Sequence, residues 1–223
     1  MERVSGATKS SAGPRELARL VHAAGVRDAR VLEAVSSVPR AAFVPPERVD
    51  RAYRDEPIEI PHGQVTTQPS LVARMLEALT LESWERVLEV GAGYGFQTAL
   101  LTRLAGEVIS VERFADLAAA ARDNLASQGI TSFEILVADG SGGLPARAPF
   151  DAILVSAAFT RVPAPLVEQL KPSGRLVQPI GPGGHDEVVL FERTSAGLER
   201  RRSITPAHFV RLYGAHGFAP RES

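Results

Sequence analysis

Three glycines at alternate positions mark the segment of the chain with the clearest chemical meaning. Gly91, Gly93 and Gly95 directly follow the apolar run Val87–Val90, and a helical pattern follows them. Glycines lack Cβ atoms, so they let the backbone turn sharply and approach a ligand closely, as at many nucleotide sites between a strand and a helix. Dinucleotide-binding proteins usually have G-x-G-x-x-G, which would require glycine where this chain has Phe96. The loop therefore predicts a nucleoside-containing ligand, with a nicotinamide dinucleotide as the less favoured alternative.

Acidic residues follow the next two apolar runs at the same relative place. Glu112 ends the run after the loop, about 20 residues beyond it, and Asp139 with Gly140 comes just after the following run. The carboxyl ends of parallel strands meet at one edge of an open sheet, where such sheets bind ligands. We therefore expect Glu112 to accept hydrogen bonds from ribose hydroxyls, and Asp139 with Gly140 to border an adenine ring.

The charge beside the loop favours a cationic ligand over a pyrophosphate. A pyrophosphate is best bound by Lys, Arg or a helix N-terminus free of nearby carboxylates, whereas Glu89 lies two residues before Gly91. S-adenosylmethionine combines adenosine with a sulfonium cation, and the Glu89 carboxylate is suited to offset its α-amino group. The sequence therefore predicts S-adenosylmethionine as the cofactor.

Strand-like and helical patterns alternate from Arg86 onward, which is typical of a mostly parallel sheet wound with helices. The predicted strands are Val87–Val90, Val108–Val111, Phe133–Val137, Ala152–Ser156, Arg175–Pro179 and Val188–Phe191. The predicted helices between them are Phe96–Leu104, Ala115–Ser127 and Pro165–Leu170. Two terminal runs without a crossover helix, Leu198–Ile204 and Phe209–Tyr213, predict antiparallel strands that pair with each other.

The residues before this alternation have a different character. Residues 1–11 are small and polar, and they predict a mobile tail. Helical spacing predicts three helices, the first from Pro14, the second capped by Asp28 and the third at Pro69–Leu79. The proline-rich stretch 39–62 predicts an ordered loop that lies on the core. We therefore expect an α/β chain in which residues 1–82 cover the active site of a Rossmann-like core, 83–223, that uses S-adenosylmethionine, the two segments forming one functional unit.

The composition excludes several classes of protein. A chain of 223 residues with 44% hydrophobic and 23% charged residues is globular rather than disordered. Its 25 basic and 26 acidic residues leave a net charge of −1, which gives no long-range field for nucleic acid or an acidic membrane. Cysteine is absent and the histidines are scattered, so we expect no metal site. No apolar run reaches the ~18 residues of a membrane span, and we expect a soluble, cytoplasmic monomer.

The chain resembles the protein-L-isoaspartate O-methyltransferases, a family that uses S-adenosylmethionine, from about Val31 to Phe218. The resemblance is carried by Val38-Pro-Arg-Ala-Ala-Phe-Val-Pro45, Gly63-Gln-Val-Thr-Thr-Gln-Pro69, the glycine loop as far as Gln97, Asp139-Gly140, Leu176-Val177 and Phe209-Val-Arg-Leu212. The glycine loop is shared by most methyltransferases of this architecture. The segment from Gln64 to Pro69 is the family's own.

The resemblance implies that Thr67 is the catalytic residue. The family usually has Gly-Gln-Thr-Ile-Ser-Gln-Pro here, and Thr67 falls on the active-site serine, so a hydroxyl is retained. Val65 replaces the usual threonine and Thr66 an aliphatic residue. With the glycine loop, the expected cofactor-binding residues are Gln64, Val65, Thr66, Glu89, Gly91, Gly93, Tyr94, Gly95, Glu112, Asp139 and Gly140.

The reaction implied by the resemblance is methylation of the α-carboxylate of an isoaspartyl residue in a damaged protein or peptide. The ester then closes to a succinimide, whose hydrolysis returns part of the material to aspartate. A carboxylate is ionised at pH 7 and is already a nucleophile, so positioning is the main task of the enzyme.

Two alternatives use the same cofactor. The changed residues at Val65 and Thr66 are compatible with an enzyme dedicated to one peptide, which would methylate an aspartyl side chain in a maturation pathway. A non-catalytic binding module on the same scaffold is the other. Arg211 replaces a proline of the family, and we expect it to face solvent.

Overall fold

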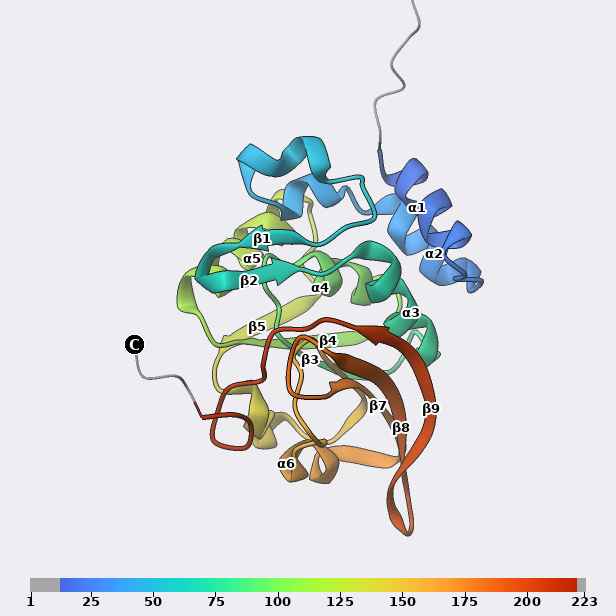
Figure 1. Ribbon diagram of the computed structural model, residues 1–223, viewed down its shortest axis with the longest axis vertical. Coiled ribbons are helices and arrows are strands. Elements are labelled where there is room, and N and C mark those ends of the chain that lie inside the picture. Colours follow the sequence, from blue (N-terminus) through green and yellow to red (C-terminus); the bar gives the residue numbers. More distant parts are fainter. Residues whose placement is uncertain (1–12, 220–223) are drawn as a thin grey trace, which may run out of the picture.

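The computed structural model describes residues 13–219, and the predicted tail at residues 1–11 lies outside them. A seven-stranded sheet in the order β5-β4-β3-β6-β7-β8-β9 forms its centre (Figure 1). The strands are β3 (Arg86–Val90), β4 (Glu107–Glu112), β5 (Phe133–Val137), β6 (Phe150–Val155), β7 (Leu170–Ile180), β8 (Asp186–Thr194) and β9 (Gly197–Ala207). Strands β3 to β7 are parallel to one another, whereas β8 pairs antiparallel with both β7 and β9. The expected α/β fold with a mostly parallel sheet is confirmed, and the six predicted strands lie in β3 to β8.

Within residues 13–219, six α-helices accompany the sheet. They are α1 (Pro14–Ala23), α2 (Ala29–Ser37), α3 (Pro69–Leu79), α4 (Phe96–Leu101), α5 (Ala115–Ser127) and α6 (Ala164–Glu168). The Asp28 side chain caps α2 by accepting hydrogen bonds from the backbone N–H groups of Arg30 and Val31, as predicted. Helix α4 ends three residues earlier than expected, and α6 ends before Leu170, which already belongs to β7. Within residues 13–219, none of the helices is both long and apolar enough to cross a membrane.

Two apolar layers hold the sheet between the helices. Alternate residues of β3 enter opposite layers, Val87 with α1 to α5 and Leu88 with α6. The first layer joins Leu17 of α1 and Met75 of α3 to the sheet in one continuous cluster of buried side chains. Burial of each such side chain stabilises the fold by about 1.5–3 kcal/mol. The N-terminal helices therefore share their core with the sheet.

The predicted pairing of the two terminal strands is wrong. Strand β9 pairs antiparallel with β8 because the two are joined at the Thr194–Gly197 pair by a tight two-residue turn, which favours a hairpin. Residues 209–213 form no strand and lie instead across the end of β6. There Ala158 donates its N–H to the Val210 carbonyl and accepts from the Leu212 N–H, both at 2.7 Å.

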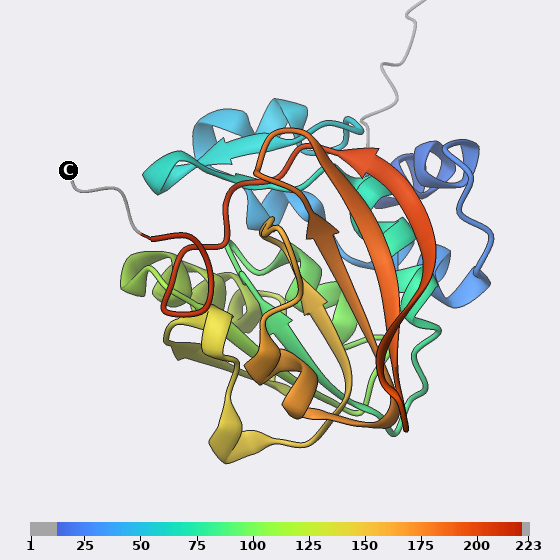
Figure 2. The same ribbon diagram turned by 60° about the horizontal axis from the view of Figure 1, so that its bottom comes forward.

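The proline-rich stretch contains short turns and half of a hairpin that the sequence analysis did not predict. Strand β1 (Ile58–Ile60) pairs antiparallel with β2 (Gln64–Thr66) around a turn at Pro61–Gly63. The stretch also contains the 3-10 turns η1 (Arg40–Phe43) and η2 (Pro46–Arg51). Two further 3-10 turns, η4 (Gly140–Gly142) and η5 (Pro145–Arg147), lie between β5 and β6. The hairpin lies across the carboxyl ends of the parallel strands, beside the segment that follows β9 (Figures 1 and 2). This arrangement brings Gln64 to Thr66 over the glycine loop.

Candidate active site

The glycine loop forms a turn in which all three glycines have positive φ values. These are +96° at Gly91, +55° at Gly93 and +92° at Gly95, a region that other residues rarely adopt. A Cβ atom on Gly95 would lie 3.3 Å from the Ala121 carbonyl oxygen of α5. Gly95 therefore lets α4 and α5 pack closely, whereas Gly91 and Gly93 line the cavity beside the turn.

Two adjoining hollows cross the carboxyl ends of β3, β4 and β6. The first, about 60 Å³, lies between the glycine turn and the β1–β2 hairpin, and the second, also about 60 Å³, extends toward Gly140. Both are lined by Gln64, Gly91, Glu112 and Ser156, so they form one groove. Its position is the one predicted for a ligand of an open parallel sheet.

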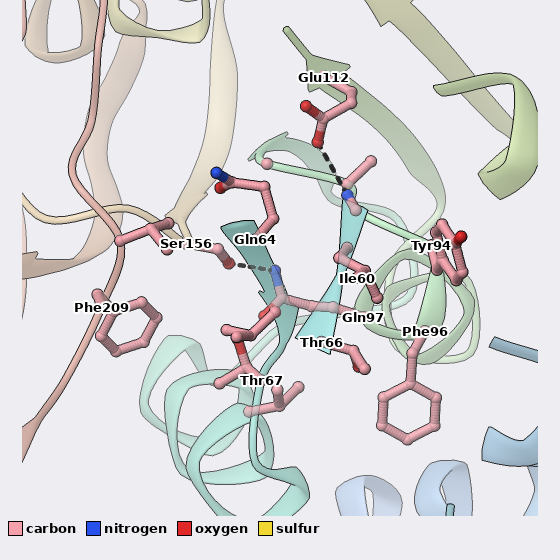
Figure 3. Close-up of a pocket in the computed structure, with 16 residues that line it drawn as sticks. Ile60, Gln64, Thr66, Thr67, Tyr94, Phe96, Gln97, Glu112, Ser156 and Phe209 are labelled. Atoms are coloured by element: carbon pink, nitrogen blue, oxygen red, sulfur yellow. Dashed lines mark hydrogen bonds between the residues drawn. The ribbon is translucent and has the colours of Figure 1, made fainter. Parts of the chain in front are cut away.

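Glu112 is held rigidly at the centre of this groove. Its Oε2 atom accepts a hydrogen bond from the Gly93 N–H at 3.0 Å (Figure 3). Its Oε1 atom accepts from the Phe114 N–H at 3.1 Å. The residue is only 6% exposed, and it lines both hollows. Two anchored carboxylate oxygens keep further lone pairs free, which suits a ligand with neighbouring hydroxyl groups.

Glu89 lies outside the groove, which differs from the expected contact with the methionine end of a cofactor. It is fully buried, and its carboxylate accepts hydrogen bonds from Gln97 Nε2 at 2.9 Å and from the hydroxyls of Thr98 and Ser110 at 2.5 Å. Burial raises the pKa of Glu89, and these hydrogen bonds oppose the shift. Gln97 separates the carboxylate from the cavity.

Gln97 and Ser156 are the polar residues that line the groove beside Glu89. Gln97 Nε2 donates to Ser156 Oγ at 2.9 Å (Figure 3). It also donates to Glu89, so both of its N–H bonds are used. Its amide oxygen is left as an acceptor. The sequence analysis gave neither residue a role, although Ser156 directly follows β6 and the rule that located Glu112 points to it too.

Thr67 stands between the groove and a larger hollow on its other side. This larger hollow, about 390 Å³, is lined by Thr67 and Val65 together with Asp55, Gln68, Ser70, Leu71, Arg74 and residues 205–208. Within residues 13–219 the Thr67 hydroxyl has no hydrogen-bond partner. Figure 3 shows Thr67 at the end of β2, next to Thr66 and facing the same cavity as Gln97. The arrangement gives one side chain access to two compartments.

The remaining predicted residues occupy the hairpin and the far end of the groove. Gln64, Val65, Thr66 and Tyr94 line the first hollow, and Gly140 lines the second. Asp139 lies just outside, in a surface hollow beside Tyr213. Its Oδ1 atom accepts from the Ser141 N–H and hydroxyl, and its Oδ2 atom accepts from the Ala215 N–H at 2.7 Å. Burial raises the pKa of Asp139, but these hydrogen bonds outweigh it and lower the pKa.

Arg211 takes part in the structure of the C-terminal segment. Its Nε atom donates to the Pro182 carbonyl at 2.8 Å, and its guanidinium lies 5.1 Å from the centre of the Phe218 ring. It is half-buried at the rim of the groove, so the expectation that it faces only solvent is wrong.

Comparison with known proteins shows the family of this chain. The family model described as protein-L-isoaspartate(D-aspartate) O-methyltransferase matches residues 14–217. A protein-L-isoaspartate O-methyltransferase from Anaeromyxobacter dehalogenans strain 2CP-C is 49% identical over 200 residues, which are 89% of this chain and 96% of the relative. The chain belongs to this family. A second member of the isoaspartate methyltransferase family, from Methanoculleus marisnigri, is 46% identical over 198 residues, with 89% of this chain and 90% of the relative covered.

Solved structures show the same fold. A protein-L-isoaspartate O-methyltransferase matches with a TM-score of 0.78 and 28% identity over 91% of this chain and 67% of that chain. The Plasmodium falciparum structure, in complex with S-adenosyl-L-homocysteine, also has a TM-score of 0.78, at 23% identity over 90% of this chain and 98% of that chain. The resemblance and the fold predicted from the sequence are therefore confirmed.

Proposed function

We propose that this chain is an S-adenosylmethionine-dependent carboxyl O-methyltransferase that acts on the α-carboxylate of L-isoaspartyl residues in damaged proteins and peptides. Membership of the family supports the reaction. The observation that carries the proposal is the position of Thr67, whose side chain borders both the groove at the strand ends and the larger hollow. A methyl donor and an anionic acceptor approaching from these two sides meet at its hydroxyl.

The residues around the groove fit S-adenosylmethionine. Glu112 would hold the ribose, Gly140 would border the adenine, and Gly91 and Gly93 offer close approach of the backbone to the methionine portion. When bound, this cofactor supplies a methyl group on a sulfonium ion. The amide oxygen of Gln97 has no hydrogen-bond partner within residues 13–219 and suits the α-ammonium group, with Glu89 and Ser156 fixing its orientation.

The acceptor side needs orientation rather than a base. A carboxylate is ionised at neutral pH, and we propose that the Thr67 hydroxyl donates a hydrogen bond to one oxygen so that the other faces the methyl group. Such alignment converts an encounter of two molecules into a local reaction and lowers barriers by up to ~7–11 kcal/mol. The walls contributed by Val65 and Phe209 also keep water from the reacting atoms.

Residues of one chain line both compartments, and we propose that the protein acts as a monomer. Residues 1–82 provide the hairpin and Thr67, residues 83–223 provide the groove, and both line the same cavity. We therefore propose that the two segments act as one functional unit. Size-exclusion chromatography with light scattering should give the mass of one chain, 23.8 kDa, for the active species. Activity confined to a dimer would contradict this.

A dedicated peptide-modifying enzyme is the second candidate, and Val65 supports it. This residue lines the first hollow of the groove and also the larger hollow. The hydroxyl usual in the family is therefore missing from the wall between donor and acceptor. A less polar wall changes which acceptors are tolerated. The alternative predicts that an aspartyl side chain in one precursor peptide is methylated in preference to an isoaspartyl residue.

One assay separates the two candidates. Transfer of labelled methyl from S-adenosylmethionine would be measured to a short isoaspartyl peptide, to its aspartyl twin and to the neutral isoasparaginyl twin. We expect transfer to the isoaspartyl peptide alone. Preference for the aspartyl twin would replace the proposal with the peptide-modifying enzyme, and binding of S-adenosylhomocysteine without any transfer would indicate a binding module.

A further inference from the structure

Arg40 is a fully buried cation that the reaction described above does not use. It is 0% exposed and heads the largest fully buried side chains in residues 13–219. Its guanidinium donates hydrogen bonds to the carbonyls of Ala52 (3.2 Å), Arg54 (3.1 Å) and Glu56 (3.0 Å) on one side, and of Thr67 (3.2 Å) and Thr66 (3.5 Å) on the other. One side chain therefore joins residues 52–56 to the segment that bears Thr67.

The charge of Arg40 is balanced by backbone dipoles instead of a contacting carboxylate. Within residues 13–219 it forms no ion pair. Burial lowers its pKa to about 10, while the nearby carboxylates of Asp55 and Glu56 favour the charged form. The guanidinium thus remains a cation at neutral pH. It also lies 5.6 Å from the centre of the Phe96 ring, which lines the groove.

A second contact fixes the same segment from the same side. The Asp55 carboxylate accepts hydrogen bonds from the Ser70 N–H at 2.8 Å and from Gln68 Nε2 at 3.0 Å. Residues 66–70 are therefore attached to residues 52–56 at both ends, by Arg40 and by Asp55. The fork of the guanidinium spans several carbonyls with fixed geometry, which a lysine ammonium cannot do.

We propose that Arg40 is a positioning residue for the methyl acceptor, acting by fixing the peptide planes of Thr66 and Thr67. Threonine has a stiff χ1 angle, so the direction of its hydroxyl follows the backbone that carries it. With both carbonyls held, the hydroxyl is directed to the boundary between the groove and the larger hollow. This inference rests on the proposed role of the Thr67 hydroxyl.

The test compares Arg40→Lys with Arg175→Lys as a matched control. The Arg175 guanidinium also donates several hydrogen bonds, to the Glu85 carboxylate and the Leu79 carbonyl, but it lies near the amino end of β3. For Arg40→Lys we expect kcat to fall about ten- to a hundredfold, the range that a small misplacement of reacting groups produces, with S-adenosylhomocysteine affinity nearly unchanged. The control should keep native kcat. Native kcat in a folded Arg40→Lys protein would overturn the inference.

A double-mutant cycle with Thr67→Val separates positioning from a general loss of structure. If Arg40 acts through Thr67, the Arg40→Lys/Thr67→Val protein should be no slower than Thr67→Val alone. Losses that multiply would overturn the inference and leave the proposed function standing. Native turnover in Thr67→Val would instead overturn the proposed role of Thr67. Should Arg40→Lys fail to fold, Arg40→Gln supports the same cycle, because it removes the buried charge and keeps two N–H donors.

Discussion

Replacing Thr67 by valine should slow methyl transfer while leaving cofactor binding intact. Valine keeps the volume and the branched Cβ of threonine, so the backbone and the χ1 preference are retained and only the hydroxyl is lost. Because that hydroxyl has no partner within residues 13–219, its removal leaves no buried group unsatisfied there. The change therefore tests one hydrogen bond to the acceptor and little else.

The size of the effect follows from the charge of the acceptor. A hydrogen bond to an ionised group contributes about 1.5–3 kcal/mol. Since each 1.36 kcal/mol corresponds to a tenfold change in rate, kcat/KM for an isoaspartyl peptide should fall roughly 10- to 150-fold in Thr67→Val.

The assay is transfer of labelled methyl to the peptide, combined with calorimetry of S-adenosylhomocysteine binding. Thr67→Ser is the control, because it restores the hydroxyl and should recover most of the native rate. Thr67→Val with native kcat/KM would refute the assigned role. A Thr67→Val protein that has lost S-adenosylhomocysteine binding would show that the residue belongs to the cofactor site instead.

Three further predictions concern the surroundings of the site. Gly95→Ala should lower the melting temperature more than the affinity for S-adenosylhomocysteine, because its Cβ would crowd α5 and not the groove; an unchanged melting temperature would contradict this. His62→Ala should speed S-adenosylhomocysteine release in stopped-flow experiments, because His62 attaches the hairpin to the start of α5. Its ring lies 2.7 Å from the Asp116 carboxylate and stacks on the Phe114 ring with 4.1 Å between the centroids. Native release rates would contradict this role of His62. The pKa of Asp139 lies below its ordinary 3.8, so the stability it provides is complete above that pH and is lost as the pH falls through the lower folded value. Hydrogen exchange at Ala215, which donates to Asp139, should report this loss, and Asp139→Asn should abolish the pH dependence.

The residues that the sequence located best are those governed by one local rule. Gly91, Gly93 and Glu112 come at or just after the ends of strands, and parallel strands bring such positions to a single edge. Glu89 did not follow that rule, because it lies within β3 on the same side as Val87. Its side chain therefore points under α4, where Gln97 and Thr98 meet it, and not toward the edge.

The contacts that the sequence could not locate join segments far apart in the chain. Arg40 belongs to a motif that carries the family resemblance, but the motif gives it no partner, and its carbonyl partners lie 12 to 27 positions away. Backbone carbonyls carry no residue-specific signal, so no motif marks them. The run Phe209–Tyr213 has the composition of a strand, yet the tight β8–β9 turn already supplies the partner of β9.

This difference separates the two halves of the site. The cofactor groove is built from consecutive strand ends, so altering it disturbs the sheet and its packing at Gly95 and Glu112. The acceptor wall is built from residues 52–56, 65–70 and 205–208, and the first two of these segments are joined by the side-chain contacts of Arg40 and Asp55. Substitutions at residues that line the larger hollow and not the groove, such as Leu71 and Arg74, should therefore change the acceptor without disturbing the methyl donor. Selectivity among peptides should consequently respond to changes in the acceptor wall while S-adenosylhomocysteine affinity stays constant, and variants in which both change together would show that the two halves are coupled.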